Sequence, residues 1–353
     1  MRHLIRKSKI FACLLILCGL TGVANSADTV APKYTLTIAI SGETLVYFPL
    51  YVARAGGFFE REGIKVDWVN VGAASRQTPA VMGGSADVTP LSLFHMFDAE
   101  SKGLKLVAIS DLFDATALQV VLTNKALKST GITASMSLDE KIKRLKGLQI
   151  GTSAPGSGTE TAFRKMLIAR GIDPDKWVQL RPVGGAAPSL AAFQNGLIDG
   201  VVYAAPVPEI IESKGLGRTV IDGFTGEVPE VAGVPFLVLA TSRDTIQKKG
   251  PMINAAVAAI AKAMAFTQQH PEETSAMLRQ YFQNTDPAVY AKMADSYRKA
   301  SARSPLITPQ QVANTARWTG IGETHPVDAK YLDIVDPEPA RLALGQTSAK
   351  QGQ

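Results

Sequence analysis

Three observations predict an α/β fold of two similar lobes with a mostly helical C-terminal segment. Short apolar runs alternate with amphipathic stretches between about residues 34 and 240, a pattern typical of chains that build parallel sheets. The punctuation of the first half of this region by glycine, aspartate and proline recurs in the second half. From Met252 onward the pattern is mostly helical.

The first round of this pattern begins with Tyr34–Ile40, which alternates polar and apolar residues and predicts a strand. Ser41–Thr44 is the turn at its end. The other elements expected in this round are helices at Tyr47–Ala55, from Val71 to Gly83, and at Leu91–Lys102, and strands at Ile64–Val69, Asp87–Thr89 (ending at Pro90), Leu104–Ser110 and Leu118–Thr123.

A polar, poorly patterned connection is expected at residues 124–137, before a helix at Leu138–Lys146. The second round then comprises strands at Leu148–Ile150, Trp177–Pro182, Asp199–Tyr203, Arg218–Ile221 and Phe236–Ala240, and helices from about Ser157 to Gly171, from Val183 to Gly196 and at Pro208–Lys214. In the C-terminal segment, Asp286-Pro287 and Thr308-Pro309 each place a cap before a first-turn proline. Residues 346–353 are polar and expected to be loose.

The two rounds match at nearly constant spacing, which indicates a duplicated lobe. The equivalent residues are 108, 112, 112 and 116 positions apart, too far for a solenoid repeat. They are the pairs Gly63 and Gly171, Val71 and Val183, Asp87 and Asp199, and Pro90 and Pro206. We expect lobe I to comprise residues 33–122 and 224–345, lobe II residues 123–223, and the strands Leu118–Thr123 and Phe236–Ala240 to cross between them.

The turn from Gly151 to Gly158 is the leading candidate for a binding site. It follows a buried strand and opens an amphipathic helix, where bare backbone N–H groups and the positive end of the helix dipole favour small anions. Ser157 and Glu160 have the spacing of a capping box, which alone is ordinary helix punctuation. A P-loop is excluded because Ser157, not lysine, follows Gly156, and no third small residue completes a dinucleotide fingerprint.

Composition and the first residues indicate an exported protein without nucleic-acid binding. The net charge of +6 arises largely at positions 1–26, which hold four of the 37 basic residues and no acidic residue. The remaining 33 basic and 31 acidic residues give a charge of +2, which does not indicate a surface for nucleic acid. A basic start, an apolar run at Ile10–Val23 and small residues at 24–26 predict a signal peptide over residues 1–26. Both cysteines, Cys13 and Cys18, lie inside it and lack the context of a lipoprotein site. The mature chain is therefore expected to have no disulfide, and no later stretch is expected to span a membrane.

The stretch Tyr47–Val66 (YFPLYVARAGGFFEREGIKV) resembles the first-lobe signature of the substrate-binding proteins of ABC transporters for nitrate, sulfonate, taurine, bicarbonate and thiamine pyrimidines. The repeated G-x-x-D pair and the Ser-Gly-Thr turn at 157–159 are similar to that family as well. The resemblance, over roughly residues 35–240, implies a two-lobe periplasmic-binding-protein fold of type II. It implies a periplasmic, monomeric receptor that captures a small polar molecule, with a sulfonate or taurine favoured, and delivers it to an ABC permease and its ATPase.

By position in that family, the resemblance implies a cleft lined from both lobes. The ligand-binding residues that it implies are Gly42, Glu43, Tyr47, Pro90, Leu91, Ser92 and Asp114 from the first lobe, and Ser157, Gly158, Thr159, Gly184, Gly185, Ala205 and Pro206 from the second. Glu43 separates two ligand classes. A carboxylate in the cleft repels a bare anion and favours an amino-bearing ligand, whereas a solvent-facing Glu43 says nothing.

An enzyme is not expected, and neither a cofactor nor a metal is predicted. A pyrimidine-synthesising enzyme shares the fold class, and by resemblance it would need a cysteine-rich iron motif that residues 27–353 lack. Of the histidines, His95 is the one predicted to lie on a helix near the cleft. The alternatives left open are a pyrimidine-precursor-binding or synthase-like protein and a sensor that uses the same cleft.

Overall fold

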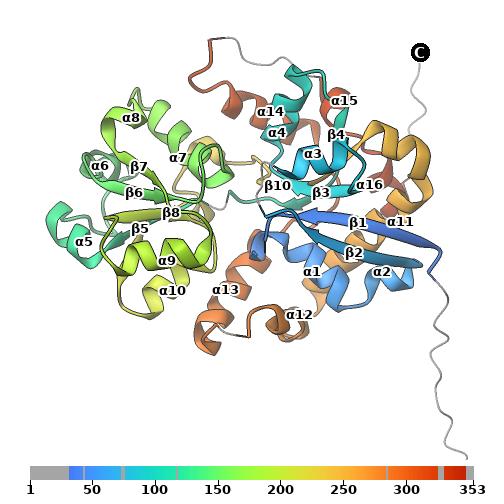
Figure 1. Ribbon diagram of the computed structural model, residues 1–353, viewed down its shortest axis with the longest axis horizontal. Helices are drawn as coiled ribbons and strands as arrows, with labels where there is room; N and C mark the ends of the chain where they lie inside the picture. The colour runs from blue at the N-terminus through green and yellow to red at the C-terminus, as the bar shows by residue number, and fades with distance from the viewer. Residues whose placement is uncertain are drawn as a thin grey trace, which may run out of the picture. The chain divides into compact units, whose positions relative to one another are not determined.

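The computed structural model describes residues 32–346, except residues 43, 73–75, 117, 284 and 325–329. The predicted signal peptide, Glu43 and residues 347–353 of the predicted tail lie outside the described residues. Within the described region the chain forms two five-stranded mixed sheets surrounded by helices (Figure 1). The α/β prediction is confirmed.

The first sheet has the strand order β2-β1-β3-β10-β4. β1 pairs in parallel with β2 and β3, and β10 runs antiparallel between β3 and β4. Its strands are β1 (Tyr34–Ile40), β2 (Ile64–Asn70), β3 (Val88–Leu91), β4 (Leu106–Phe113) and β10 (Leu237–Ser242).

The second sheet repeats this plan with the order β7-β6-β8-β5-β9. β6 pairs in parallel with β7 and β8, and β5 runs antiparallel between β8 and β9. Its strands are β5 (Gln119–Thr123), β6 (Gln149–Thr152), β7 (Gln179–Pro182), β8 (Gly200–Tyr203) and β9 (Gly217–Asp222).

The repeated aspartate has the same structural role in both sheets. Asp87 accepts a hydrogen bond from the backbone N–H of Thr37 at 2.9 Å, and Asp199 accepts one from the N–H of Gln149 at 2.9 Å. Each aspartate thereby occupies a backbone donor of the neighbouring parallel strand, at Thr37 within β1 and at Gln149, the first residue of β6. Both pairs are 112 positions apart, so the duplication predicted from the sequence is confirmed. The match of Pro90 with Pro206 is wrong, because Pro90 lies inside β3 whereas Pro206 follows β8.

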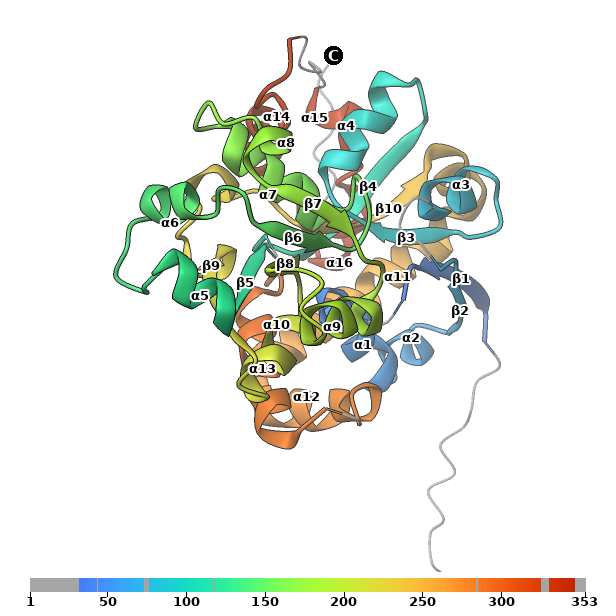
Figure 2. The same ribbon diagram turned by 60° about the vertical axis from the view of Figure 1, so that its left-hand side comes forward.

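Helices cover both faces of each sheet (Figure 2). In the second sheet, Val120 and Leu122 of β5 pack in the cluster that holds α6 and α7, whereas Val121 packs with α9 and α10, as strand alternation requires. The helices are α1 (Phe48–Ala55), α2 (Phe58–Arg61), α3 (Gln77–Met82), α4 (Phe94–Ser101), α5 (Asn124–Thr130), α6 (Leu138–Arg144), α7 (Gly158–Ile168), α8 (Pro174–Trp177), α9 (Ala186–Gln194), α10 (Val207–Ser213), α11 (Arg243–Gln269), α12 (Pro271–Leu278), α13 (Pro287–Ala300), α14 (Pro309–Thr319), α15 (Tyr331–Ile334) and α16 (Glu338–Ala343).

Three expected elements differ from the structure. The connection predicted at 124–137 contains helix α5, whose start is capped by the Thr123 side chain; only Ala126 of this helix is buried, so its pattern is weak. Trp177 ends helix α8 instead of beginning a strand. The strands expected to cross between lobes belong to one sheet each, and the chain passes from one sheet to the other between β4 and β5 and again between β9 and β10.

The lobe boundaries stay a prediction, although the pairing of β5 bears on them. Residues 119–122, counted with lobe I, pair with β8 and β9 of the second sheet. The sequence of an apolar strand does not show which sheet the strand joins, so its assignment to a lobe depends on its pairing partners.

α11 is the one helix of the described residues that is long and apolar enough to cross a membrane by length and composition. Half of its apolar window is buried inside the protein. Ile253, Val257, Ile260 and Met264 pack in the core cluster of the first sheet. These contacts identify α11 as a core helix of the first sheet.

Candidate functional site

The residues expected to bind a ligand lie in turns after strands of both sheets. Pro90 and Leu91 are an exception, since β3 continues through them by pairing with β10, and both are buried. The remaining described residues are Gly42 after β1, Tyr47 at the end of the short 3-10 helix Leu45–Tyr47, Ser92 after β3, Asp114 after β4, Ser157, Gly158 and Thr159 at the start of α7, Gly184 and Gly185 before α9, and Ala205 and Pro206 before α10.

Ser157 is the N-cap residue of α7, but the predicted capping box does not form. Its side chain makes no capping hydrogen bond. Glu160 instead accepts a hydrogen bond from the backbone N–H of Gly156 at 2.9 Å and pairs with Arg164. Within the described part of the chain, Ser157 Oγ is buried without a hydrogen-bond partner. This hydroxyl is therefore available to a bound group.

At Gly158 the start of α7 lies against Ser92, which follows β3, and against Phe236, which lies between β9 and β10. A Cβ placed on Gly158 would lie 3.1 Å from the Cε2 and Cζ atoms of Phe236 and 3.2 Å from Ser92 Oγ. Gly42 and Gly185 have no heavy atom within 4 Å of such a Cβ. The predicted residues Ser92 and Gly158 therefore lie together, and a larger residue at 158 would need Phe236 or Ser92 to move by a few tenths of an ångström.

Ala205 joins the two sheets through its backbone. Its N–H donates to the hydroxyl of Tyr297 on α13 at 2.5 Å, and its carbonyl accepts from Thr44 Oγ1 at 3.5 Å. Burial raises the pKa of Tyr297 well above its ordinary value. These two hydrogen bonds therefore connect the turn between β8 and α10 to Tyr297 of α13 and to Thr44.

Tyr47 is a core residue. Its side chain is 3% exposed, its hydroxyl lies 3.0 Å from Ser41 Oγ, and burial raises its pKa. Nearby, Gln77 is buried and donates to Thr89 Oγ1 and to the carbonyl of Pro90, both at 2.9 Å. Gln77 thus fixes the end of β3, a role that nothing in its sequence neighbourhood indicates.

His95 on α4 is held neutral. Burial lowers its pKa to about 4, its ring lies 4.1 Å from the Phe94 ring, and its Nδ1 is buried with no partner among the described residues. Trp318 of α14, whose Nε1 is likewise unpartnered there, contacts Phe94 at 5.2 Å between ring centroids. His95 Nδ1 and Trp318 Nε1 could therefore each form a hydrogen bond that no described residue supplies.

Asp114 belongs to a separate cluster. Gln311 Nε2 donates to Asp114 Oδ1 at 2.9 Å and to Asp111 Oδ2 at 2.8 Å. Burial, and then the neighbouring Asp114 carboxyl, raise the pKa of Asp111 well above its ordinary value. These groups border a cavity of about 260 Å³ with Lys299 and Arg303, apart from the start of α7.

Sequence reasoning missed several groups at these turns, among them Thr44, Gln77, Phe236 and Tyr297. Thr44 ends the predicted turn Ser41–Thr44 and Phe236 begins the predicted strand Phe236–Ala240, but nothing in the local sequence marks either residue as a contact of the site. Tyr297 and Gln77 meet the turns from helices distant in sequence, and no local signal marks them.

The chain resembles binding proteins in sequence. Residues 31–302 match the model of the NMT1-like family. YtlA of Bacillus subtilis, named as a binding protein, is 24% identical over 264 residues, which cover 74% of this chain and 75% of YtlA. The 4-amino-5-hydroxymethyl-2-methylpyrimidine phosphate synthase of Uromyces fabae is 30% identical over only 108 residues, 31% of this chain and 29% of the synthase.

Solved structures share the fold. A protein from Bordetella bronchiseptica superposes with a TM-score of 0.76 at 24% identity, over 89% of this chain and 98% of that one. The alkanesulfonate-binding protein SsuA from Xanthomonas axonopodis, bound to MOPS, superposes with a TM-score of 0.62 at 17% identity, over 81% and 91% of the two chains. The predicted periplasmic-binding-protein fold is confirmed.

Proposed function

Because the chain belongs to the NMT1-like family, we propose that it is a periplasmic solute receptor that binds a small sulfonate-type anion and passes it to an ABC permease and its ATPase. It acts as a monomer, without a cofactor, and leaves the ligand chemically unchanged. The binding-protein name of YtlA and the alkanesulfonate-binding SsuA fold support this assignment.

The unpartnered Ser157 hydroxyl is the observation that carries the proposal. It lies at the start of α7, an 11-residue helix, whose first backbone N–H groups have no partner within the helix. Ser92 Oγ lies close to Gly158 from the other sheet. Neutral hydroxyl and N–H donors at a helix start suit an anion, which the helix dipole further stabilises.

A pyrimidine precursor is the second candidate ligand. The 108-residue match to the pyrimidine phosphate synthase favours it, and Glu43 facing the ligand would favour an amino group. A synthase-like activity on such a compound is the corresponding enzymatic alternative.

Calorimetric titration of residues 27–353 tests the proposal. The ligands are methanesulfonate, taurine, nitrate and an aminopyrimidine. We expect a sulfonate to bind and Ser157→Ala to weaken its binding by about 10- to 100-fold, because a hydrogen bond to a charged group contributes about 1.5–3 kcal/mol. Stability should be nearly unchanged, since the hydroxyl has no partner to lose.

Ser101→Ala is the matched control, because Ser101 is an exposed hydroxyl that bonds only the carbonyl of Asp98. Equal sulfonate affinity in the wild type and in Ser157→Ala would reject the site. Binding of the aminopyrimidine alone would select the second candidate.

A further inference from the structure

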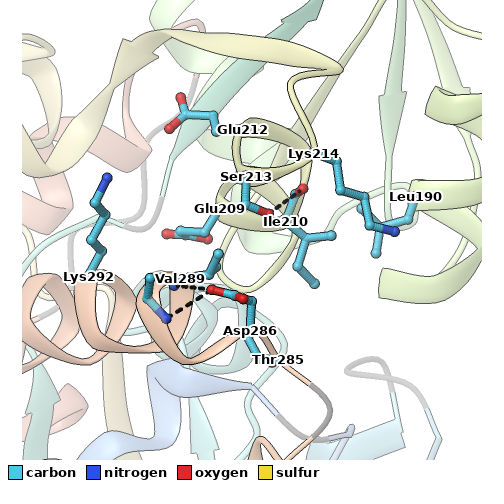
Figure 3. Close-up of a pocket in the computed structure, with 11 residues that line it drawn as sticks. Leu190, Glu209, Ile210, Glu212, Ser213, Lys214, Thr285, Asp286, Val289 and Lys292 are labelled. Atoms are coloured by element: carbon cyan, nitrogen blue, oxygen red, sulfur yellow. Dashed lines mark hydrogen bonds between the residues drawn. The ribbon is translucent and has the colours of Figure 1, made fainter.

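A second cavity, of about 900 Å³, lies between α10 and the start of α13. Its apolar wall includes Leu190, Ile210 and Val289, and its rim carries Lys214 and Lys292. Figure 3 shows the Glu209 carboxylate directed from α10 toward α13. None of the residues expected to bind the anion lines this cavity.

Glu209 has an acceptor that the protein leaves unused. Its Oε2 is buried and has no hydrogen-bond partner within the described residues. Among the ion pairs of the described residues, none joins Glu209 to Lys214 or Lys292, which line the same cavity. A buried carboxylate oxygen without a donor costs free energy that a bound donor would recover.

The other two carboxylates of the cavity are already engaged. Glu212 accepts from the backbone N–H of Thr219 at 2.8 Å. Asp286 caps α13 by accepting from the N–H groups of Ala288 and Val289 (Figure 3). Glu209 is therefore the carboxylate of this cavity that can turn to a ligand without breaking a helix or strand contact.

The charges around Glu209 define the head group that fits. Burial first, and then the acidic neighbours Glu212 and Asp222, raise the pKa of Glu209 to about 7. On the α13 side, Tyr297 supplies a neutral phenol. The cavity lining sets Lys214 and Lys292 against three carboxylates, which leaves one negative charge when Glu209 is ionised. A cationic donor fills the empty acceptor and offsets that charge.

We propose that this cavity is a second binding site, for an organic ammonium compound with a short hydrocarbon body. The ammonium group donates to Glu209 Oε2, and the hydrocarbon packs on Leu190, Ile210 and Val289. The site joins α10 of the second sheet to α13 of the first-sheet core, and it is independent of the anion site at α7.

Titration with pentylamine tests the site, with pentanoate as the probe that has the same chain but no ammonium group. The buffer is held above the pKa of Glu209, so that the carboxylate is charged. We expect pentylamine to bind and pentanoate not to bind. Glu209→Gln should weaken pentylamine about tenfold or more, whereas Glu272→Gln, an exposed carboxylate on α12, should leave it unchanged.

Methyl resonances give a measurement on the unaltered protein. Pentylamine should shift the signals of Ile210 and Val289. Unshifted signals, equal binding of pentanoate, or undiminished binding in a folded Glu209→Gln would each overturn the site. Ser157→Ala should retain pentylamine binding, so failure of the anion site and failure of this site are separable.

Discussion

Replacing Gly158 by alanine tests the close approach between α7 and the first-sheet side. The added Cβ would lie 3.1 Å from two ring atoms of Phe236 and 3.2 Å from Ser92 Oγ. Favourable contacts between carbon atoms lie at about 3.5–4.0 Å, so the neighbours must retreat by roughly half an ångström. Phe236 is itself buried and has little room to do so.

The expected loss of stability is modest and has two parts. Overpacking of this kind costs about 1–3 kcal/mol, and alanine in place of glycine in a helix recovers at most ~1 kcal/mol. The free energy of unfolding, measured by urea denaturation, should fall by about 0–3 kcal/mol relative to the wild type. It should lie about 1–3 kcal/mol below that of a glycine-to-alanine change that gains the same helix propensity without the close contact. Ser92→Ala combined with Gly158→Ala should recover part of the loss, because it removes the hydroxyl that the new methyl group meets.

Gly250→Ala is the matched control, since its Cβ would meet no atom within 4 Å. It should be neutral or stabilise the protein by up to ~1 kcal/mol. The reasoning is refuted if Gly158→Ala is as stable as Gly250→Ala, because the contact would then impose no steric cost.

Three further changes have defined outcomes in urea denaturation. Asp199→Ala leaves the N–H of Gln149 without its acceptor and should cost about 1–3 kcal/mol. Lys165→Met removes the ammonium group that donates to the backbone carbonyls of Thr319, the last residue of α14, at 2.7 Å and of Ile321 at 3.0 Å. It should cost a similar amount, about 1–3 kcal/mol. The pKa of Glu209 is raised from 4.5 to about 7 in the folded protein. Its contribution to the free energy of unfolding is therefore fully present below pH 4.5 and is lost as pH rises through about 7, a decrease of about 3 kcal/mol. Glu209→Gln should remove this pH dependence.

Each of these changes has a control. Asp87→Ala should cost more than Asp199→Ala, because Asp87 also pairs with Lys249 at 2.6 Å; equal costs would contradict the comparison. Lys128→Met, at an exposed position of α5, should be near neutral, and a Lys165→Met variant of equal stability would show that the carbonyls gain nothing from Lys165. An unchanged pH profile in Glu209→Gln would mean that other groups titrate between pH 4.5 and 7.

Much of the fold could be predicted because its signals are local or periodic. Asp87 and Asp199 repeat at a spacing of 112 residues and take the same place in the two sheets. Asp286 and Thr308 cap the helices α13 and α14, as the sequence predicts. In these cases the partner atoms lie a few residues away, or the pattern occurs twice, so the sequence alone contains the information.

The candidate site depended on tertiary contacts that no local pattern contains. The capping box at Ser157 has the right spacing, yet Glu160 bonds to Gly156 and Arg164 instead, which leaves the serine hydroxyl free. The turn of β8 meets Tyr297 of α13, 92 positions away.

By itself, the sequence determined the α/β class and the duplicated lobe plan, and it indicated the strand-end turns that we propose to bind a ligand. The tertiary structure decided which of those turns meet, that Tyr47 is buried in the core, and that Glu209 keeps an unused acceptor beside a cavity. The physical reason is that hydrogen bonding and burial within a turn depend on neighbouring residues, whereas contacts between segments depend on how whole sheets and helices pack.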